Sequence, residues 1–109
     1  MEESYDKGQH LYFIKMKGFN RVKIGIAQNP QHRMEVLQIG NPYELRLICV
    51  VPYGGKFLEK LIQKNFSNYR GEWYEFSPAL QEVIKQANKI CYETGLIWHK
   101  QRQKISVKA

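Results

Sequence analysis

Apolar and polar residues alternate with two different periods along the chain, and these periods predict the order of its elements. Residues 10–15, HLYFIK, are aromatic and β-branched, which is typical of a strand. In residues 21–26, RVKIGI, apolar side chains alternate with Lys23 and Gly25, so this second strand should have one packed face and one more open face. The short segment between them contains glycine and asparagine, which indicates a hairpin loop.

The next segment begins with a signal for the start of a helix. Asn29 can cap free amide groups and Pro30 suits the first helical position, so we expect a helix from Pro30 to about Ile39. Gly40 is expected to end it in the left-handed conformation. Residues 44–51, ELRLICVV, predict a third strand whose second half is apolar on both faces and should be covered on both sides.

The second half of the chain predicts two more helices. Residues 56–66, KFLEKLIQKNF, are amphipathic, and the expected buried side consists of Phe57, Leu58, Leu61 and Ile62. Residues 70–78, RGEWYEFSP, indicate a loop with a short extended piece. Ser77 and Pro78 then repeat the cap-and-proline start, and apolar residues follow at helical spacing to an end near Gly95.

This order of elements predicts an α+β fold with a three-stranded, mainly antiparallel sheet flanked by three helices. The chain has 109 residues, which suits one domain, and we place this domain at residues 10–95. Residues 1–9 are expected to form a flexible lead and residues 96–109 a basic tail. Such a tail is either a solvated end or an arm that follows phosphates.

Composition and charge narrow the choice of partner. The formal net charge is +7, which favours nucleic acid as partner, with plain solubility as the competing explanation. Cys49 and Cys91 lie within apolar patterns, so we expect both to be reduced core residues in a cytoplasmic, reducing compartment. The polar N-terminus is not a signal peptide, and the apolar run at residues 47–51 is too short for a bilayer, so no membrane association is expected.

Candidate chemistry is limited to a dispersed set of residues. Tyr12 lies on the first expected strand, Lys23 and Gly25 on the second, Arg33 on the first helix and Glu59 on the second. Phosphodiester hydrolysis needs a group that activates water, a cation that offsets charge on the phosphate, and often a metal held by a carboxylate. A tyrosine or lysine, an arginine and a glutamate would supply these functions.

Each of these residues also has an ordinary structural explanation. Tyr12 could be a core tyrosine and Lys23 a solvated strand residue. Arg33 could pair with Glu35, and Glu59 could join a neighbouring lysine in a surface ion pair worth at most about 1 kcal/mol. In RGEWYEF, packing is expected of Trp73 and Tyr74, and secondary candidates for a further carboxylate are Glu72 and Glu75.

The spacing of the set resembles the signature of the GIY-YIG nuclease superfamily. Residues 10–12, HLY, and then, after ten residues, residues 23–25, KIG, resemble its two halves. Arg33 falls where that superfamily has its helix arginine, and Glu59 where it has the metal-binding glutamate. The runs VKIGIAQNPQHR, LQIGNP, FLEKLIQKNF and RGEWYEF are similar to the small phage-type and "meiotically up-regulated" branch, in which the second tyrosine is commonly lysine.

This resemblance implies a metal-dependent endonuclease that cleaves nucleic acid, and we favour DNA over RNA as its substrate. Glu59 would hold a single Mg²⁺ or Mn²⁺ ion. Tyr12 would help to deprotonate water, Lys23 would assist it or replace the second tyrosine, and Arg33 would offset charge on the phosphate. Gly25 would leave room for the substrate backbone. The residues expected to contact the substrate are Gly25, His32, Gln63, Lys56 and Lys60.

Three positions depart from the pattern of the superfamily. His10 stands in place of the first glycine, while Leu37 and Gln63 stand where related nucleases have histidines. Glutamine cannot shuttle a proton at neutral pH, and losing an acid or base can cost about 10²- to 10⁴-fold in rate. The alternative is therefore a catalytically weak or inactive nucleic-acid-binding module of the same fold. A third hypothesis is a domain that binds an acidic protein partner.

Overall fold

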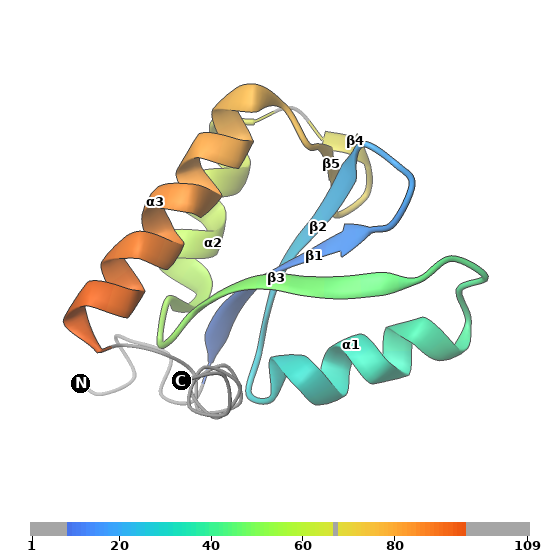
Figure 1. Cartoon of the computed structure of the whole chain (residues 1–109), viewed down its shortest axis with the longest axis horizontal. Coiled ribbons are helices and arrows are strands. Elements are labelled where there is room, and N and C mark those ends of the chain that lie inside the picture. Colours follow the sequence, from blue (N-terminus) through green and yellow to red (C-terminus); the bar gives the residue numbers. More distant parts are fainter. Residues whose placement is uncertain (1–8, 67, 96–109) are drawn as a thin grey trace.

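The computed structural model describes residues 9–66 and 68–95, and within them five strands form one antiparallel sheet (Figure 1). The sheet has the order β3-β1-β2-β5-β4, and three helices pack on it. The strands are β1 (His10–Met16), β2 (Arg21–Ala27), β3 (Leu45–Val51), β4 (Asn68–Arg70) and β5 (Trp73–Glu75). The helices are α1 (Pro30–Ile39), α2 (Gly55–Lys64) and α3 (Pro78–Thr94). The predicted α+β class is confirmed; residues 1–8 of the expected lead and the tail at 96–109 lie outside the described residues.

The expected number of strands was wrong, because two short strands extend the sheet beyond β2. β5 pairs with the first half of β2, from Arg21 opposite Glu75 to Lys23 opposite Trp73, and β4 pairs with β5. Each of these strands has three residues. Three residues are too few to show the alternation that identifies a strand from sequence.

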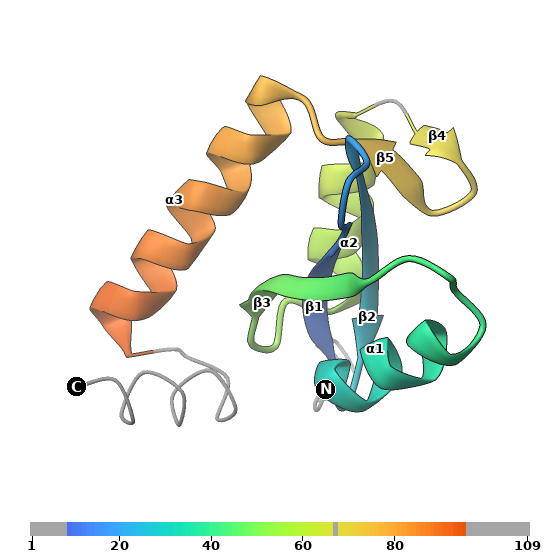
Figure 2. The same ribbon diagram turned by 45° about the vertical axis from the view of Figure 1, so that its right-hand side comes forward.

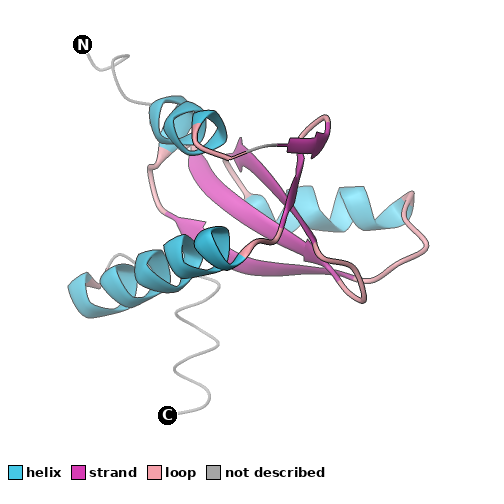
Figure 3. Ribbon diagram, turned by 90° about the horizontal axis from the view of Figure 1, so that it is seen from above, coloured by secondary structure: helices cyan, strands magenta, loops and turns pink. Residues whose placement is uncertain are grey.

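The two faces of the sheet are covered by different helices. α2 and α3 cover one face and α1 covers the other (Figures 1, 2 and 3). The buried cluster under α2 and α3 contains Leu11, Phe13, Val22, Ile24, Cys49, Tyr74, Leu80 and Ile84. The cluster under α1 contains Tyr12, Ile14, Leu45 and Val50, with Met34, Leu37 and Trp73 packed against it. Both faces are therefore packed, as predicted for the second half of β3.

The face of β2 that carries Lys23 and Gly25 is less open than expected. Lys23 is only 8% exposed, and Gly25 is buried as well. α1 and Trp73 contribute side chains to the cluster on this side, which explains the difference. The alternative explanation of Lys23 as a solvated strand residue is therefore wrong.

The ends of α1 and α3 follow the predicted caps, with one exception. Asn29 Oδ1 accepts the His32 backbone N–H at 3.1 Å, and α1 begins and ends at the predicted residues. Gly40 has φ −95°, so the expected left-handed stop was wrong. The loop is instead tied by Gln38, whose amide bonds three backbone groups between residues 41 and 45. α3 ends at a left-handed Gly95, as expected.

The predicted buried side of α2 was only half right. Leu58 and Ile62 pack against the core, whereas Phe57 is 80% exposed and Leu61 is 46% exposed. Among the described elements, α2 packs mainly against β2 and β1, and its outer side is exposed. A helix covered on one side buries a narrow stripe, and apolar residues next to that stripe remain in solvent.

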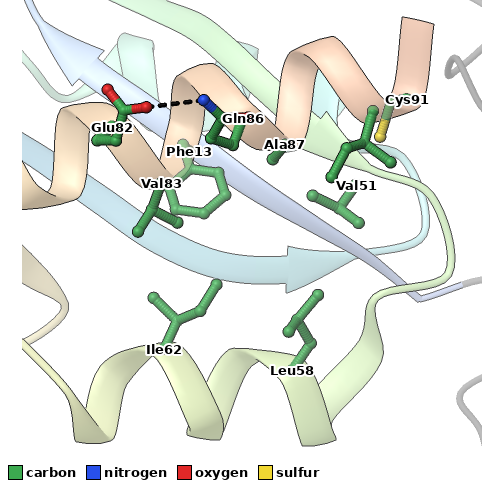
Figure 4. A pocket seen from close by; sticks show the side chains of 10 residues that line it. Phe13, Val51, Leu58, Ile62, Glu82, Val83, Gln86, Ala87 and Cys91 are labelled. Atoms are coloured by element: carbon green, nitrogen blue, oxygen red, sulfur yellow. Dashed lines mark hydrogen bonds between the residues drawn. The ribbon is translucent and has the colours of Figure 1, made fainter. Parts of the chain in front are cut away.

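Both cysteines are buried and free, as expected for core thiols. Burial, with a smaller contribution from Cys91, raises the pKa of the Cys49 thiol to about 12, so this thiol stays neutral. Burial also raises the pKa of Cys91, which lines a hollow of about 490 Å³ between α2 and α3. Figure 4 shows Leu58 and Ile62 entering this hollow from α2, opposite Val83 and Ala87.

Candidate functional site

Tyr12 and Gly25 are direct neighbours on paired strands, and their packing defines the floor of the site. Tyr12 of β1 stands opposite Gly25 of β2. A Cβ atom added to Gly25 would lie 2.5 Å from the Tyr12 hydroxyl oxygen and 2.7 Å from the ring carbon that bears it. The Tyr12 ring therefore extends across β2 at a glycine, because any other residue would place a Cβ atom where the ring lies. In this structure the space above Gly25 is filled by Tyr12; that Gly25 also contacts substrate stays a prediction.

Arg33 lies on α1, the helix that covers the Tyr12 side of the sheet. Its side chain is exposed and lies near enough to the phenol to lower its pKa. Burial raises the pKa of Tyr12, and the negative charges of Glu72 and Glu59 add to this, while Arg33 lowers it. Because burial prevails, the phenol is neutral at pH 7 in the free protein. Glu35, the alternative partner considered for Arg33, accepts a hydrogen bond from Gln31 at 3.2 Å.

Lys23 is held by Glu72, a residue that the sequence indicated only as a secondary candidate. The Lys23 ammonium donates to a Glu72 carboxylate oxygen, and the lysine side chain is 10% exposed against 55% for the glutamate. The preceding Gly71 has φ +58°, which permits the tight turn before β5. The Glu72 carbonyl also accepts the Ile24 N–H at 3.3 Å. The block RGEWYEF was the one signal that could have identified this partner.

Glu59 approaches the same region from α2 and is oriented by Gln63. The Gln63 side-chain amide donates to the Ile24 carbonyl at 3.3 Å and to the Glu59 carboxylate at 3.4 Å. Burial raises the pKa of Glu59, and repulsion from Glu72 raises it further. The Gln63 hydrogen bond and the charges of two lysines act in the opposite direction. Glu59 is thus a carboxylate held in a position that is unfavourable for its own charge.

The predicted catalytic residues lie within electrostatic range of one another. The Tyr12 hydroxyl is influenced by Arg33, Glu72 and Glu59, and Glu72 in turn holds Lys23. One connected set of polar and charged groups is therefore formed by side chains from two strands, the turn before β5 and two helices. Their catalytic roles stay a prediction.

The remaining predicted substrate contacts surround this set. His32 is exposed beside Arg33 on α1, and Lys56 and Lys60 are exposed on α2, where both lower the pKa of Glu59. Hydrogen-bond donors are therefore presented to solvent at the edge of the site by Lys56, Lys60 and His32.

Two departures from the signature have a structural explanation. His10, at the position of the first glycine, accepts the Tyr53 backbone N–H at its Nδ1 atom at 3.0 Å. The two rings also meet edge to face with centroids 4.8 Å apart. His10 thereby fixes the turn between β3 and α2. Leu37 packs against the cluster under α1.

A hydrated divalent ion is compatible with the carboxylates present. Within residues 9–66 and 68–95 no group of three or more His, Cys, Asp or Glu side chains forms a ready metal cluster. Mg²⁺, however, commonly keeps several waters and uses one or two carboxylates together with substrate phosphates. Glu59 meets this requirement, because it is partly buried and repelled by Glu72, and a cation would relieve that repulsion.

The fold and the site indicate a nuclease-like or nucleic-acid-binding module: an antiparallel sheet supports a phenol, a guanidinium, an ammonium and a carboxylate beside exposed basic side chains. Comparison with protein families gives the same class, since the profile of the T5orf172 domain, a nuclease-type domain, matches residues 9–91. The chain belongs to the T5orf172 domain family.

Other comparisons add no relative. A search of curated proteins and a search of solved structures returned no match. Within the described part of the chain, none of the helices combines the length and apolar character needed to cross a membrane.

Proposed function

We propose that this protein is a metal-dependent endonuclease that hydrolyses phosphodiester bonds in DNA at a GIY-YIG-type site. The observation that carries the proposal is the packing of Tyr12 over Gly25, on the side of β2 that also carries the Lys23–Glu72 ion pair. Arg33 and Glu59 lie near enough to this phenol to shift its pKa. Membership of the T5orf172 family and the net charge of +7 support a nucleic-acid substrate.

Each side chain has a task that follows from its surroundings. Arg33 offers a planar fork of donors that can bind a phosphate and offset the charge that develops on it. Tyr12 is neutral in the free protein, so it first donates a hydrogen bond that orients water or a phosphate oxygen. Neutralising the carboxylates of Glu59 and Glu72 would lower the pKa of Tyr12. Once the phenol has lost its own proton to solvent, the phenolate oxygen could accept a proton from the attacking water. Lys23 contributes positive charge next to Glu72.

Glu59 is the residue that would hold Mg²⁺ or Mn²⁺. A divalent ion bound there supplies Lewis acidity toward the phosphate and lowers the pKa of a bound water. Gln63 orients the Glu59 carboxylate by its hydrogen bond and is itself fixed to β2 through the Ile24 carbonyl. Such a second contact keeps a metal ligand in place.

Plasmid nicking tests the proposal. Supercoiled DNA incubated with the protein and Mg²⁺ or Mn²⁺ should be nicked, and Glu59→Ala and Arg33→Ala should each abolish nicking. Glu82→Ala, which removes an exposed carboxylate from α3, is the matched control and should leave the rate unchanged. Nicking that persists in Glu59→Ala would refute the assignment.

One observation favours a second function, that of a nucleic-acid-binding module with weak or no catalysis. Gln63 stands where related nucleases have a histidine, and its amide is already engaged by Ile24 and Glu59. Such a module would bind DNA with strong salt dependence and without dependence on metal. If proton transfer at this position limits the rate, Gln63→His should raise nicking by about 10²-fold or more. Binding without nicking in both the natural chain and Gln63→His would favour the second function.

A further inference from the structure

The outer side of α2 carries both exposed apolar residues and a row of lysines. Phe57 is 80% exposed and Leu61 is 46% exposed. Lys56, Lys60 and Lys64 are exposed on the same helix. Single exposed apolar residues are common, but Phe57 and Leu61 are four residues apart and therefore neighbours on the helix surface, where they form one small apolar patch beside the lysines.

The spacing of these residues places the aromatic ring among the ammonium groups. The three lysines recur at every fourth residue, about 6 Å apart along the helix axis. Lys60 and Lys64 follow Phe57 by three and seven residues, so they flank it on one side of the helix. Leu58 and Ile62 point the other way, into the hollow under α3 (Figure 4). The ring is therefore bordered by positive charge and is not part of the packed core.

The charge of this side selects the kind of partner. The single carboxylate of α2 is Glu59, which Gln63 holds toward β2. A second copy of the chain related by a two-fold axis would bring two rows of lysines together, which is unfavourable. A strand of nucleic acid instead offers phosphates to the lysines and flat bases to the phenylalanine, the combination found in surfaces that bind single strands.

The lysine row also connects this surface to the candidate site. Lys56 lies three residues before Glu59 on α2 and Lys60 directly follows it, so the lysine row runs past this carboxylate. A strand whose phosphates follow the lysines would pass beside Glu59. This continuity distinguishes α2 from α3, whose exposed Lys85 and Lys89 lie on a helix that carries none of the predicted site residues.

We propose that α2 binds an unpaired segment of nucleic acid, with a base stacked on Phe57 and phosphates on Lys60 and Lys64. This inference deepens the proposed function. It rests on that function for one point, namely that the bound strand runs toward Glu59. It assigns a single-stranded or locally unpaired substrate in place of a fully paired duplex. Leu61 extends the apolar part of the surface beside the ring.

Binding of labelled oligonucleotides to the full chain in EDTA tests this surface separately from cleavage. Phe57→Ala should weaken binding of single-stranded DNA by about 5- to 150-fold without changing the salt slope. Lys60→Ala and Lys64→Ala should each reduce the magnitude of the slope of log K against log salt by about 0.7. Phe57→Trp should bind like the natural chain, and its added fluorescence should be quenched by the oligonucleotide.

Matched controls come from two other helices. Ile39→Ala removes an 86% exposed apolar side chain from α1, and Lys85→Ala removes an exposed lysine from α3; both should bind as tightly as the natural chain. Thermal melts of all variants establish that the fold is intact. DNA, RNA and duplex probes of one sequence are compared, and dependence on Phe57 with either single strand supports the proposal.

Two results would overturn it. Phe57→Ala could bind single strands with unchanged affinity, or Phe57 could matter only for self-association seen by sedimentation, which would assign the surface to a second copy. Because these measurements use no metal, a lack of plasmid nicking would remove the proposed function and leave this inference standing. Nicking that requires Glu59, together with binding that is insensitive to Phe57, would instead support the proposed function and refute the role of α2.

Discussion

Replacing Gly25 by alanine tests the packing on which the site depends. The added methyl group would lie 2.5 Å from the Tyr12 hydroxyl oxygen, 2.7 Å from the ring carbon that bears it and 3.2 Å from a second ring carbon. Both residues lie on strands held by the β1–β2 ladder, so the backbone cannot separate without losing hydrogen bonds. Tyr12 is 2% exposed, and the ring must move within a packed cluster.

The size of the effect follows from this crowding. Overpacking of a well-packed core costs about 1–3 kcal/mol. In a domain of about this size, each kcal/mol lowers the melting temperature by about 4–8 °C. Gly40→Ala is the matched control, because nothing lies within 4 Å of its added Cβ and its φ is −95°. That variant should be neutral or stabilised by up to about 1 kcal/mol.

A double-mutant cycle identifies the cause. Urea unfolding should show that Tyr12→Phe recovers little of the loss, since the ring carbon at 2.7 Å remains. Tyr12→Leu removes the end of the ring, so in that background Gly25→Ala should cost almost nothing, with a coupling energy of about 1–3 kcal/mol. An equal loss in both backgrounds, or no loss in the natural chain, would show that Tyr12 does not occupy this space.

Three further predictions concern the charged groups. Folding raises the pKa of Glu59 above its unfolded value, so the contribution of Glu59 to stability falls as pH rises above about 4.5. Glu59→Gln should therefore melt higher than wild type at pH 7, and this difference should vanish below pH 4. Glu72→Gln leaves the Lys23 ammonium without its carboxylate and should cost about 1–3 kcal/mol in urea unfolding, whereas Glu75→Gln should be neutral. Burial lowers the pKa of His10, so the stability that comes from its neutral Nδ1 acceptor is complete above about pH 6.5 and is lost as pH falls through the lowered pKa. Between pH 5 and 8 the melting temperature of His10→Gln should therefore change less with pH than that of wild type. Identical pH dependence in the two proteins would refute this.

Local signals predicted most of the secondary structure. Asn29-Pro30 predicted the start of α1 and Ser77-Pro78 the start of α3, because a cap and a proline specify a helix start through nearby atoms. The end of α1 at Ile39 was predicted from Gly40, which follows it. The exposure of Phe57 could not be predicted in this way. An apolar stripe shows that a helix has a buried side, but the width of that side depends on which elements cover it.

The sequence predicted which residues belong to the candidate site, but it did not predict which of them contact one another. The spacing and the resemblance selected Tyr12, Lys23, Arg33 and Glu59, and the structure brings them within electrostatic range. The partner of Lys23 is Glu72, which lies 49 residues away along the chain, and only pairing of β5 with β2 brings the two together. Local patterns contain no information on such a pairing.

The backbone of Ile24 explains how groups from opposite faces of the sheet meet. β5 pairs with β2 only as far as Lys23, and the next residue, Ile24, donates its N–H to the Glu72 carbonyl and accepts Gln63 at its own carbonyl. Its two polar groups thus fix the turn that carries Glu72 and the helix that carries Glu59. Since both segments are tied to the backbone of one residue, Glu72 and Glu59 are brought near each other at β2, which accounts for the repulsion by which Glu72 raises the pKa of Glu59.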